Sequence, residues 1–329
     1  METEDIKFSA YTVRTPLLRT KENTQIPDVL MENTIRSLFK KVINSSDEER
    51  AFTAKNKKYA ELSKLLKVNG EDVIEGYFIT TTFGEVGQVY NTKTQEVTHD
   101  ITREEGDKKN VYFYFNLKTG LLLVQEDESN VLTKDTLQKY FRLRQNLVKD
   151  LITKFNSSQS EYHLPPNSPL MLLEIVQPKD FLSEVRRCTT VKHITLEYSI
   201  LNSDAKFISA INEYSTSNGL NDLGKISVKL ENSNYGEYLH GYVPFLEYIV
   251  NNDEVEIAVY GSIGGVNRTI RKDGSKNTLF YHAKDVEILG DGNLRFEELL
   301  GEMHRTNHTE KIYKPFNSSD QKKIYQFTL

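Results

Sequence analysis
The sequence predicts an α+β protein built from two domains that each mix sheet and helix. Several segments alternate apolar and polar or aromatic side chains at the two-residue period of a strand. Other segments carry apolar residues at helical spacing behind a capping Asp or Thr. Between the halves, residues 156–169 are rich in Ser, Asn and Pro, which is typical of a linker. We therefore expect domains at residues 1–157 and 158–329.

The first half alternates strands with two large helices. Strands are predicted at residues 6–13, 73–83, 86–91, 111–115 and 121–125. Helices are predicted at residues 28–43, 46–67 and 133–155, with Asp28 and Thr133 as caps. Residues 92–110 are polar and predict a mobile loop.

The second half shows strands and shorter helices in a more regular succession. Strands are predicted at residues 170–176, 191–199, 225–231, 254–261, 263–271 and 277–282. Helices are predicted at residues 180–187, 204–217, 239–250 and 294–303, followed by a polar tail after Arg305. Residues 272–275, Lys-Asp-Gly-Ser, form a strong hairpin turn.

Composition indicates a folded protein without a general affinity for polyanions. The 329 residues suffice for two ordinary domains. Aromatic residues make up 10% of the chain, and such side chains bury enough apolar area to offset chain entropy. The formal net charge of −5 is unlike that of a protein that coats nucleic acid. Any contact with phosphates would use local basic patches or few contacts.

Cysteine usage and the N-terminal residues predict a cytoplasmic protein. Cys188 is the single cysteine, which excludes an intrachain disulfide. The N-terminus is acidic, whereas a signal peptide is basic and then apolar. No apolar run of the sequence approaches the roughly 20 residues that span a bilayer.

The predicted helix 133–155 is the first basic cluster. Lys139, Arg142 and Lys149 share roughly one face, and Arg144 is offset from it by two positions. The opposite face is predicted to be core, with Tyr140, Leu143, Leu147 and Leu151. Arg142, Arg144 and Lys149 are therefore candidates for contact with phosphates, and an ordinary solvated helix face is the alternative.

Two further basic clusters lie in the second half. In residues 261–272, glycines that allow close backbone approach stand beside Arg268, Arg271 and Lys272, and arginine can hold a phosphate by paired hydrogen bonds. The alternative is an edge hairpin that bears solubilising charges. Arg186 and Arg187 form the third cluster, with surface charge as the alternative.

Catalytic and metal-binding patterns are weak. Asp253, Glu254 and Glu256 border a strand, as the acids of nucleases often do, but an acid-x-Lys pattern is missing. His304 and His308 have helical spacing without a neighbouring Glu base. We therefore expect no cofactor, no metal site and no catalytic residues, with a divergent metal-dependent nuclease as an alternative.

The order of elements resembles that of the exclusion protein A of lambdoid phage and, more loosely, the B component of the Kiwa antiphage system. The resemblance is carried by an aromatic-rich opening strand at 8–14, a loop and helix at 26–39, the aromatic strand 111–115, the apolar stretch 172–175, and the segment 186–192 that leads into an alternating strand. It covers about two-thirds of the chain, by pattern rather than by identity.

This resemblance implies a cytoplasmic protein of antiphage defence or phage exclusion that binds DNA without being an enzyme. It also implies a homodimer, and a membrane-protein partner from a defence operon is the further expectation. The alternative is a sensor or scaffold that recognises a phage or host protein. The acidic balance and the Tyr-rich strands favour that alternative, because Tyr is enriched at protein interfaces.

Overall fold

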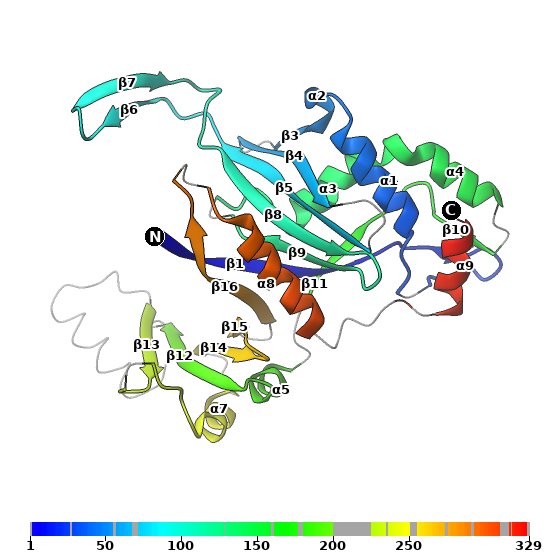
Figure 1. Cartoon of the computed structure of the whole chain (residues 1–329). Coiled ribbons are helices and arrows are strands. Elements are labelled where there is room, and N and C mark those ends of the chain that lie inside the picture. The colour runs from blue at the N-terminus through cyan, green and yellow to red at the C-terminus, as the bar shows by residue number, and fades with distance from the viewer. Residues whose placement is uncertain are drawn as a thin grey trace. The chain divides into compact units, whose positions relative to one another are not determined.

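The computed structural model confirms the α+β class, with helices packed on antiparallel sheets (Figure 1). It describes residues 2–327 apart from 27, 55–56, 68–71, 128, 159–160, 177–179, 200–224, 235, 251–254, 274–275, 291–292, 310–315 and 317. The predicted helix 204–217 and the turn residues Gly274 and Ser275 lie outside the described residues.

The chain forms two compact units. The first contains residues 1–175 and 286–329, and the second contains residues 176–285. The boundary expected between residues 157 and 158 thus falls inside the first unit. The segment after it is held there because Asn156 exchanges two hydrogen bonds with the backbone of Leu164, at 3.0 and 2.9 Å. Leu164, Leu170 and Met171 are buried in the core of the same unit.

The sheet of the first unit runs in the order β3-β4-β5-β8-β9-β1, and β11 pairs with β1. All of these pairs are antiparallel. The strands are β1 Glu2–Arg14, β3 Ala51–Ala54, β4 Lys58–Lys67, β5 Val73–Thr82, β8 Lys109–Asn116, β9 Leu121–Gln125 and β11 Leu172–Ile175. A small separate sheet pairs β2 Leu18–Arg19 with β10 Tyr162–His163.

Helices cover both faces of this sheet. They are α1 Glu32–Ile43, α2 Asp47–Arg50, α3 Lys134–Arg144, a 3-10 segment Gln145–Val148, α4 Lys149–Ser158, α8 Phe296–Thr309 and α9 Ser319–Phe327. The Phe113 ring on β8 lies 5.8 Å from Phe39 of α1. On the opposite face, the Tyr112 ring stacks on Phe296 of α8 at 5.9 Å, and α8 runs across β8 in Figure 1.

Two predictions for the first half are wrong. The described residues of 46–67 form one short helix, α2, and then β3 and β4, because Ala60 and Leu62 alternate with the polar residues Glu61 and Ser63 and face the core. Residues 92–110 are not a loop throughout, since β7 Glu96–Ile101 pairs with β6 Gly87–Asn91 in a hairpin.

The long basic helix and the polar tail also differ from expectation. The single helix predicted over 133–155 is divided by the 3-10 segment. Gln145 in that segment accepts a hydrogen bond from Leu170 N at 2.7 Å and donates one to Ser168 O at 3.1 Å. The tail contains the rest of α8 and then α9, where Gln321 binds both the N–H and the carbonyl of Leu30.

The second unit contains a sheet in the order β13-β12-β14-β15-β16, again antiparallel. Its elements are α5 Phe181–Arg186, β12 Thr190–Ser199, β13 Lys225–Glu231, α7 Tyr242–Ile249, β14 Val255–Ile263, β15 Val266–Asp273 and β16 Lys276–Ile288. Val259 and Ile270 are fully buried within it. The predicted hairpin of two strands across residues 272–275 is confirmed as β15 and β16.

The turn before β9 depends on a glycine. Gly120 has φ +67°, and a Cβ there would lie 2.3 Å from the carbonyl oxygen of Val13 and 2.8 Å from the Phe316 ring.

We predict that Gly120→Ala lowers the free energy of unfolding by about 1–3 kcal/mol. Gly301→Ala on α8 is the control, because nothing lies within 4 Å of its Cβ position and alanine favours helix. Thermal unfolding followed by circular dichroism would contradict this if both variants matched the parent.

Candidate functional site
Arg144 is buried and serves as an anchor inside the first unit. It is 6% exposed, and its guanidinium lies 3.7 Å from the centre of the Tyr140 ring. The guanidinium donates to the carbonyl oxygens of Tyr140 at 3.0 Å, Arg50 at 2.7 Å and Ala51 at 2.7 Å. Burial lowers the pKa of Arg144 below its usual value. Arg144 therefore holds α3 against the start of β3, and it cannot contact a phosphate as expected from the sequence.

Arg268 is likewise enclosed, within the second unit. Its side chain is 0% exposed, and Nη1 lies 3.0 Å from Glu184 Oε1. Glu184 also accepts hydrogen bonds from Nη1 of Arg187 at 2.9 and 2.7 Å. Arg268 therefore holds β15 against α5 through this carboxylate, and Arg187 pairs with the same carboxylate from the end of α5. Arg268 cannot contact a phosphate as expected from the sequence, because its side chain is fully buried. The Arg187 side chain is 34% exposed and already paired with Glu184.

The other predicted cations of the second unit lie beside carboxylates. Arg186 Nη2 is 2.5 Å from Glu247. Arg271 is exposed on β15, and with Lys272 it lines a small pocket of about 140 Å³ that also contains Glu256. This acid neighbour reduces the positive potential there. The second unit therefore offers a weaker site for an anion than the sequence suggested.

The strongest candidate site is a groove between α3 and β11 in the first unit, which we call the α3 groove. It has a volume of about 760 Å³. It is lined by Lys134, Asp135, Gln138, Lys139, Arg142, Leu143, Asn146, Leu172, Leu173 and Glu174. Seven of these residues come from α3 and the segment just after it, and three come from β11.

The local sequence explains why α3 presents this face. The helix begins behind Thr133, whose hydroxyl accepts a hydrogen bond from Thr136 N at 3.3 Å. Leu137, Tyr140 and Phe141 are buried in the core, so the residues between them point outward at helical spacing. β11 stays beside the helix because Leu173 N donates to Gln138 Oε1 at 3.4 Å.

The cations of the α3 groove are available to a ligand. Lys139 and Arg142 are exposed, and Lys134 is half-buried. Among the residues that the structure describes, no carboxylate lies within 4.0 Å of these three cations. Arg142 makes one long hydrogen bond, from Nη2 to Asn167 O at 3.4 Å. Two carboxylates, Asp135 and Glu174, also line the groove and offset part of its positive charge, although Glu174 is already engaged by Arg14 at 2.5 Å.

Two residues of this predicted helix, Lys149 and Leu143, do not lie where the sequence predicts. Lys149 is exposed, but it follows the 3-10 segment on α4 and does not line the α3 groove. Leu143 was expected in the core and is 57% exposed in the groove. The division of the helix at Gln145 changes the angular relation of residues before and after it, because a 3-10 turn holds 3.0 residues.

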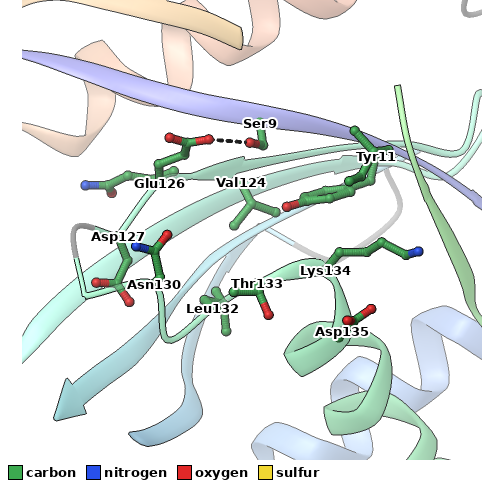
Figure 2. A pocket seen from close by; sticks show the side chains of 12 residues that line it. Ser9, Tyr11, Val124, Glu126, Asp127, Asn130, Leu132, Thr133, Lys134 and Asp135 are labelled. Carbon is green, nitrogen blue, oxygen red and sulfur yellow. Dashed lines mark hydrogen bonds between the residues drawn. The ribbon is translucent and has the colours of Figure 1, made fainter. Parts of the chain in front are cut away.

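A second pocket adjoins the groove and shares Lys134 and Asp135 with it. Figure 2 shows its side chains, with Ser9 donating to Glu126 at 2.7 Å. Its volume is about 360 Å³. Burial raises the pKa of Tyr11 in this pocket, and the nearby carboxylates of Glu126 and Asp135 raise it further. The Tyr11 hydroxyl therefore stays protonated at neutral pH.

The pocket in Figure 2 offers no activated nucleophile. Ser9 faces a carboxylate that is already bound by Lys7 at 2.7 Å, and no histidine lines the pocket. Asp127 accepts hydrogen bonds from Ser129 N at 2.8 Å and Val131 N at 3.0 Å, so it stabilises a turn. The arrangement is suited to binding polar groups rather than to acyl or phosphoryl transfer.

Metal and thiol chemistry have little support in the parts of the chain that the structure describes. No group of three metal-ligating side chains occurs among those residues. Asp253 and Glu254, two of the three acids in the nuclease alternative, lie outside them. Glu256 is described and pairs with Lys225 at 2.8 Å. Burial raises the pKa of the Cys188 thiol to about 11, so it is a poor nucleophile near neutral pH.

The sequence identified Arg142 and placed Lys139 on the same helix face, but Lys134 and the residues of β11 were not predicted for the groove. Lys134 and Lys139 precede Arg142 by eight and three positions, a helical spacing that was visible in the sequence. The contribution of β11 had no local signal, because it depends on antiparallel pairing of Leu172–Ile175 with β1.

No protein-family model matches this chain, and no curated protein matches it either. Within the described ranges, every helix is too short or too polar to cross a membrane.

Arg144 and Arg142 give a matched pair of predictions. We predict that Arg144→Gln lowers the free energy of unfolding by about 2–4 kcal/mol, because three buried carbonyl oxygens lose a charged donor. Arg142→Gln should change it by less than about 0.5 kcal/mol, because the side chain is exposed. Urea denaturation measures both values, and equal losses would contradict the assigned roles.

Proposed function
We propose that the α3 groove binds the phosphate backbone of a nucleic acid, with DNA as the leading ligand. The observation that supports this is the set of accessible cations in the groove, Lys134, Lys139 and Arg142, which have no carboxylate within 4.0 Å among the described residues. Arginine offers a planar fork of donors that matches a phosphate, and lysine offers a point charge.

The lining of the groove favours contact with the backbone over stacking on bases. None of its ten lining residues is aromatic, so it lacks the rings on which unpaired bases stack. Gln138 and Asn146 add uncharged donors beside the cations. A duplex, which presents phosphates without exposed bases, is therefore the better ligand.

The acidic balance of the chain limits the strength of this binding. Three cations that each neutralise one phosphate give a slope of log affinity against log salt of about −2.7. This slope is small beside that of proteins with many phosphate contacts. We therefore propose a weak, salt-sensitive contact that depends on a second interaction for stability in the cell.

Exposed apolar side chains favour a second candidate ligand, a segment of protein. Leu143 is 57% exposed in the groove, and Ile175 at the end of β11 is 46% exposed. An apolar centre with arginine beside it is typical of a protein interface. This candidate corresponds to the protein-binding alternative drawn from the sequence.

The nucleic-acid proposal predicts a specific loss on charge reversal. The variant Lys139→Glu/Arg142→Glu should lose measurable binding to a short fluorescein-labelled DNA duplex in fluorescence anisotropy at low salt. Single reversal of Arg142 should reduce the salt slope by about 1, because one phosphate contact is lost. Lys154→Glu, an exposed reversal on α4 outside the groove, is the control. Binding that is equal in all variants, or absent from the parent, would refute the proposal.

We also propose that the contact serves antiphage defence or phage exclusion in the bacterial cytoplasm. The resemblance in element order to the phage exclusion and Kiwa proteins supports this role. Bacteria that express the chain, with any membrane-protein partner encoded beside it, should plate phage less efficiently than bacteria without it. The variant Arg142→Glu, at equal abundance, should lose the protection. Unchanged plating across a panel of phages would count against the defence role and would leave the binding result unaffected.

A further inference from the structure
The β6–β7 hairpin is an arm that pairs with no other strand of the structure as described. We call residues 85–107 the arm. Its strands, Gly87–Asn91 and Glu96–Ile101, form a two-stranded sheet of their own. In Figure 1 the arm extends from β5 and β8 away from the side of the first unit where α4 and α9 lie. An isolated hairpin is marginally stable in water. We therefore expect that a binding partner stabilises this exposed hairpin.

The arm carries a concentration of exposed apolar side chains. Val86 is 68% exposed, Tyr90 55%, Val97 48% and Val89 39%. Tyr90 and Val97 are direct cross-strand partners, so they form a contiguous apolar pair on one face. Exposed apolar groups that cluster on one element indicate an interaction surface.

The arm is also strongly acidic. It contains six carboxylates against two cations, which gives a net charge of −4 with His99 neutral. Glu105 is partly engaged, because Thr102 N donates to it at 2.7 Å. No described cation lies within 4.0 Å of Glu96 or Asp100. Asp100 pairs with Gln88, which shares the face of Tyr90 and Val97, whereas Glu96 pairs with Asn91 on the opposite face of the hairpin.

The α3 groove has the complementary chemistry. It offers the exposed cations Lys139 and Arg142 beside the exposed side chain of Leu143. The arm offers Asp100 on the face of the apolar pair and Glu96 on the other face of the same hairpin. Charges of opposite sign around an apolar centre fix the register of an interface and raise its rate of association.

We propose that the arm of a second copy of this chain docks in the α3 groove. The arm projects away from α4 and α9 of its own unit (Figure 1), which leaves it accessible to another molecule. Each copy carries both an arm and a groove, so the contact can be made twice about a two-fold axis. The docked arm places carboxylates where the proposed function places phosphates. The arm therefore competes with nucleic acid for the groove, and this consequence rests on the proposed function, whereas the docking itself does not.

Sedimentation velocity over a range of protein concentrations, without nucleic acid, tests the docking. The parent should self-associate more weakly as salt is raised. The arm variant Glu96→Lys/Asp100→Lys and the groove variant Lys139→Glu/Arg142→Glu should each weaken association by roughly tenfold or more, because attraction becomes repulsion at two positions. The chain with all four reversals should recover association, since the charges are complementary again. Lys154→Glu should associate like the parent.

Two results would overturn the docking: a parent that stays monomeric at every concentration, or a four-reversal chain no better associated than the single-surface variants. A further variant, Tyr90→Ser/Val97→Ser, tests the apolar part without altering charge and should also weaken association.

Anisotropy with the DNA duplex separates this proposal from the proposed function. If the arm binds the groove, the Glu96→Lys/Asp100→Lys variant should bind duplex more tightly than the parent. Association that responds as predicted, with no duplex binding in any variant, would retain the docking and reject the nucleic-acid ligand.

Discussion
Strand β8 lies at the centre of the first unit with neither face open to water, and the placement of the helices follows from this. Its phenylalanines pack against α1, and its tyrosines pack against α8. A strand buried on both faces needs a cover on each. The chain supplies the second cover from residues 286–329, which belong to this unit although they follow the whole second unit in the sequence. The first unit is therefore discontinuous in sequence.

The same packing sorts the basic residues into anchors and accessible cations. Arg144 projects from the face of α3 that meets the sheet, where backbone carbonyls at the start of β3 need donors, and it satisfies them. Arg142, two positions earlier, projects from the opposite face and remains available. In the second unit, one buried carboxylate, Glu184, engages both Arg187 and Arg268. Burial thus divides each basic cluster of the sequence into residues that bind partners within the protein and residues that stay exposed. Only the exposed residues can contact a ligand.

The α3 groove and the arm give the first unit two surfaces of opposite character. The groove combines cations with the exposed Leu143, and the arm combines carboxylates with Tyr90 and Val97. Competition between a polyanion and an acidic protein segment for one groove would make nucleic-acid binding depend on protein concentration. Such competition would reconcile the acidic net charge with a nucleic-acid ligand, because the arm would restrict weak, non-specific contact.

The sequence by itself determined the α+β class, most strands, the Thr133 cap of α3, and the presence of Arg142 on an exposed basic helix. Those features depend on local periodicity and capping, which neighbouring residues specify. The cap predicted at Asp28 is wrong, because α1 begins at Glu32 behind Met31. The sequence also misassigned β4 as helix because the alternation there is short: only Ala60 and Leu62 are buried, with the polar residues Glu61 and Ser63 beside them. Only the tertiary structure decided that Arg144 and Arg268 are buried, that Leu143 is exposed, and that β11 completes the groove. Each of these features depends on contacts between residues far apart in the chain, and the neighbouring residues in the sequence do not specify such contacts.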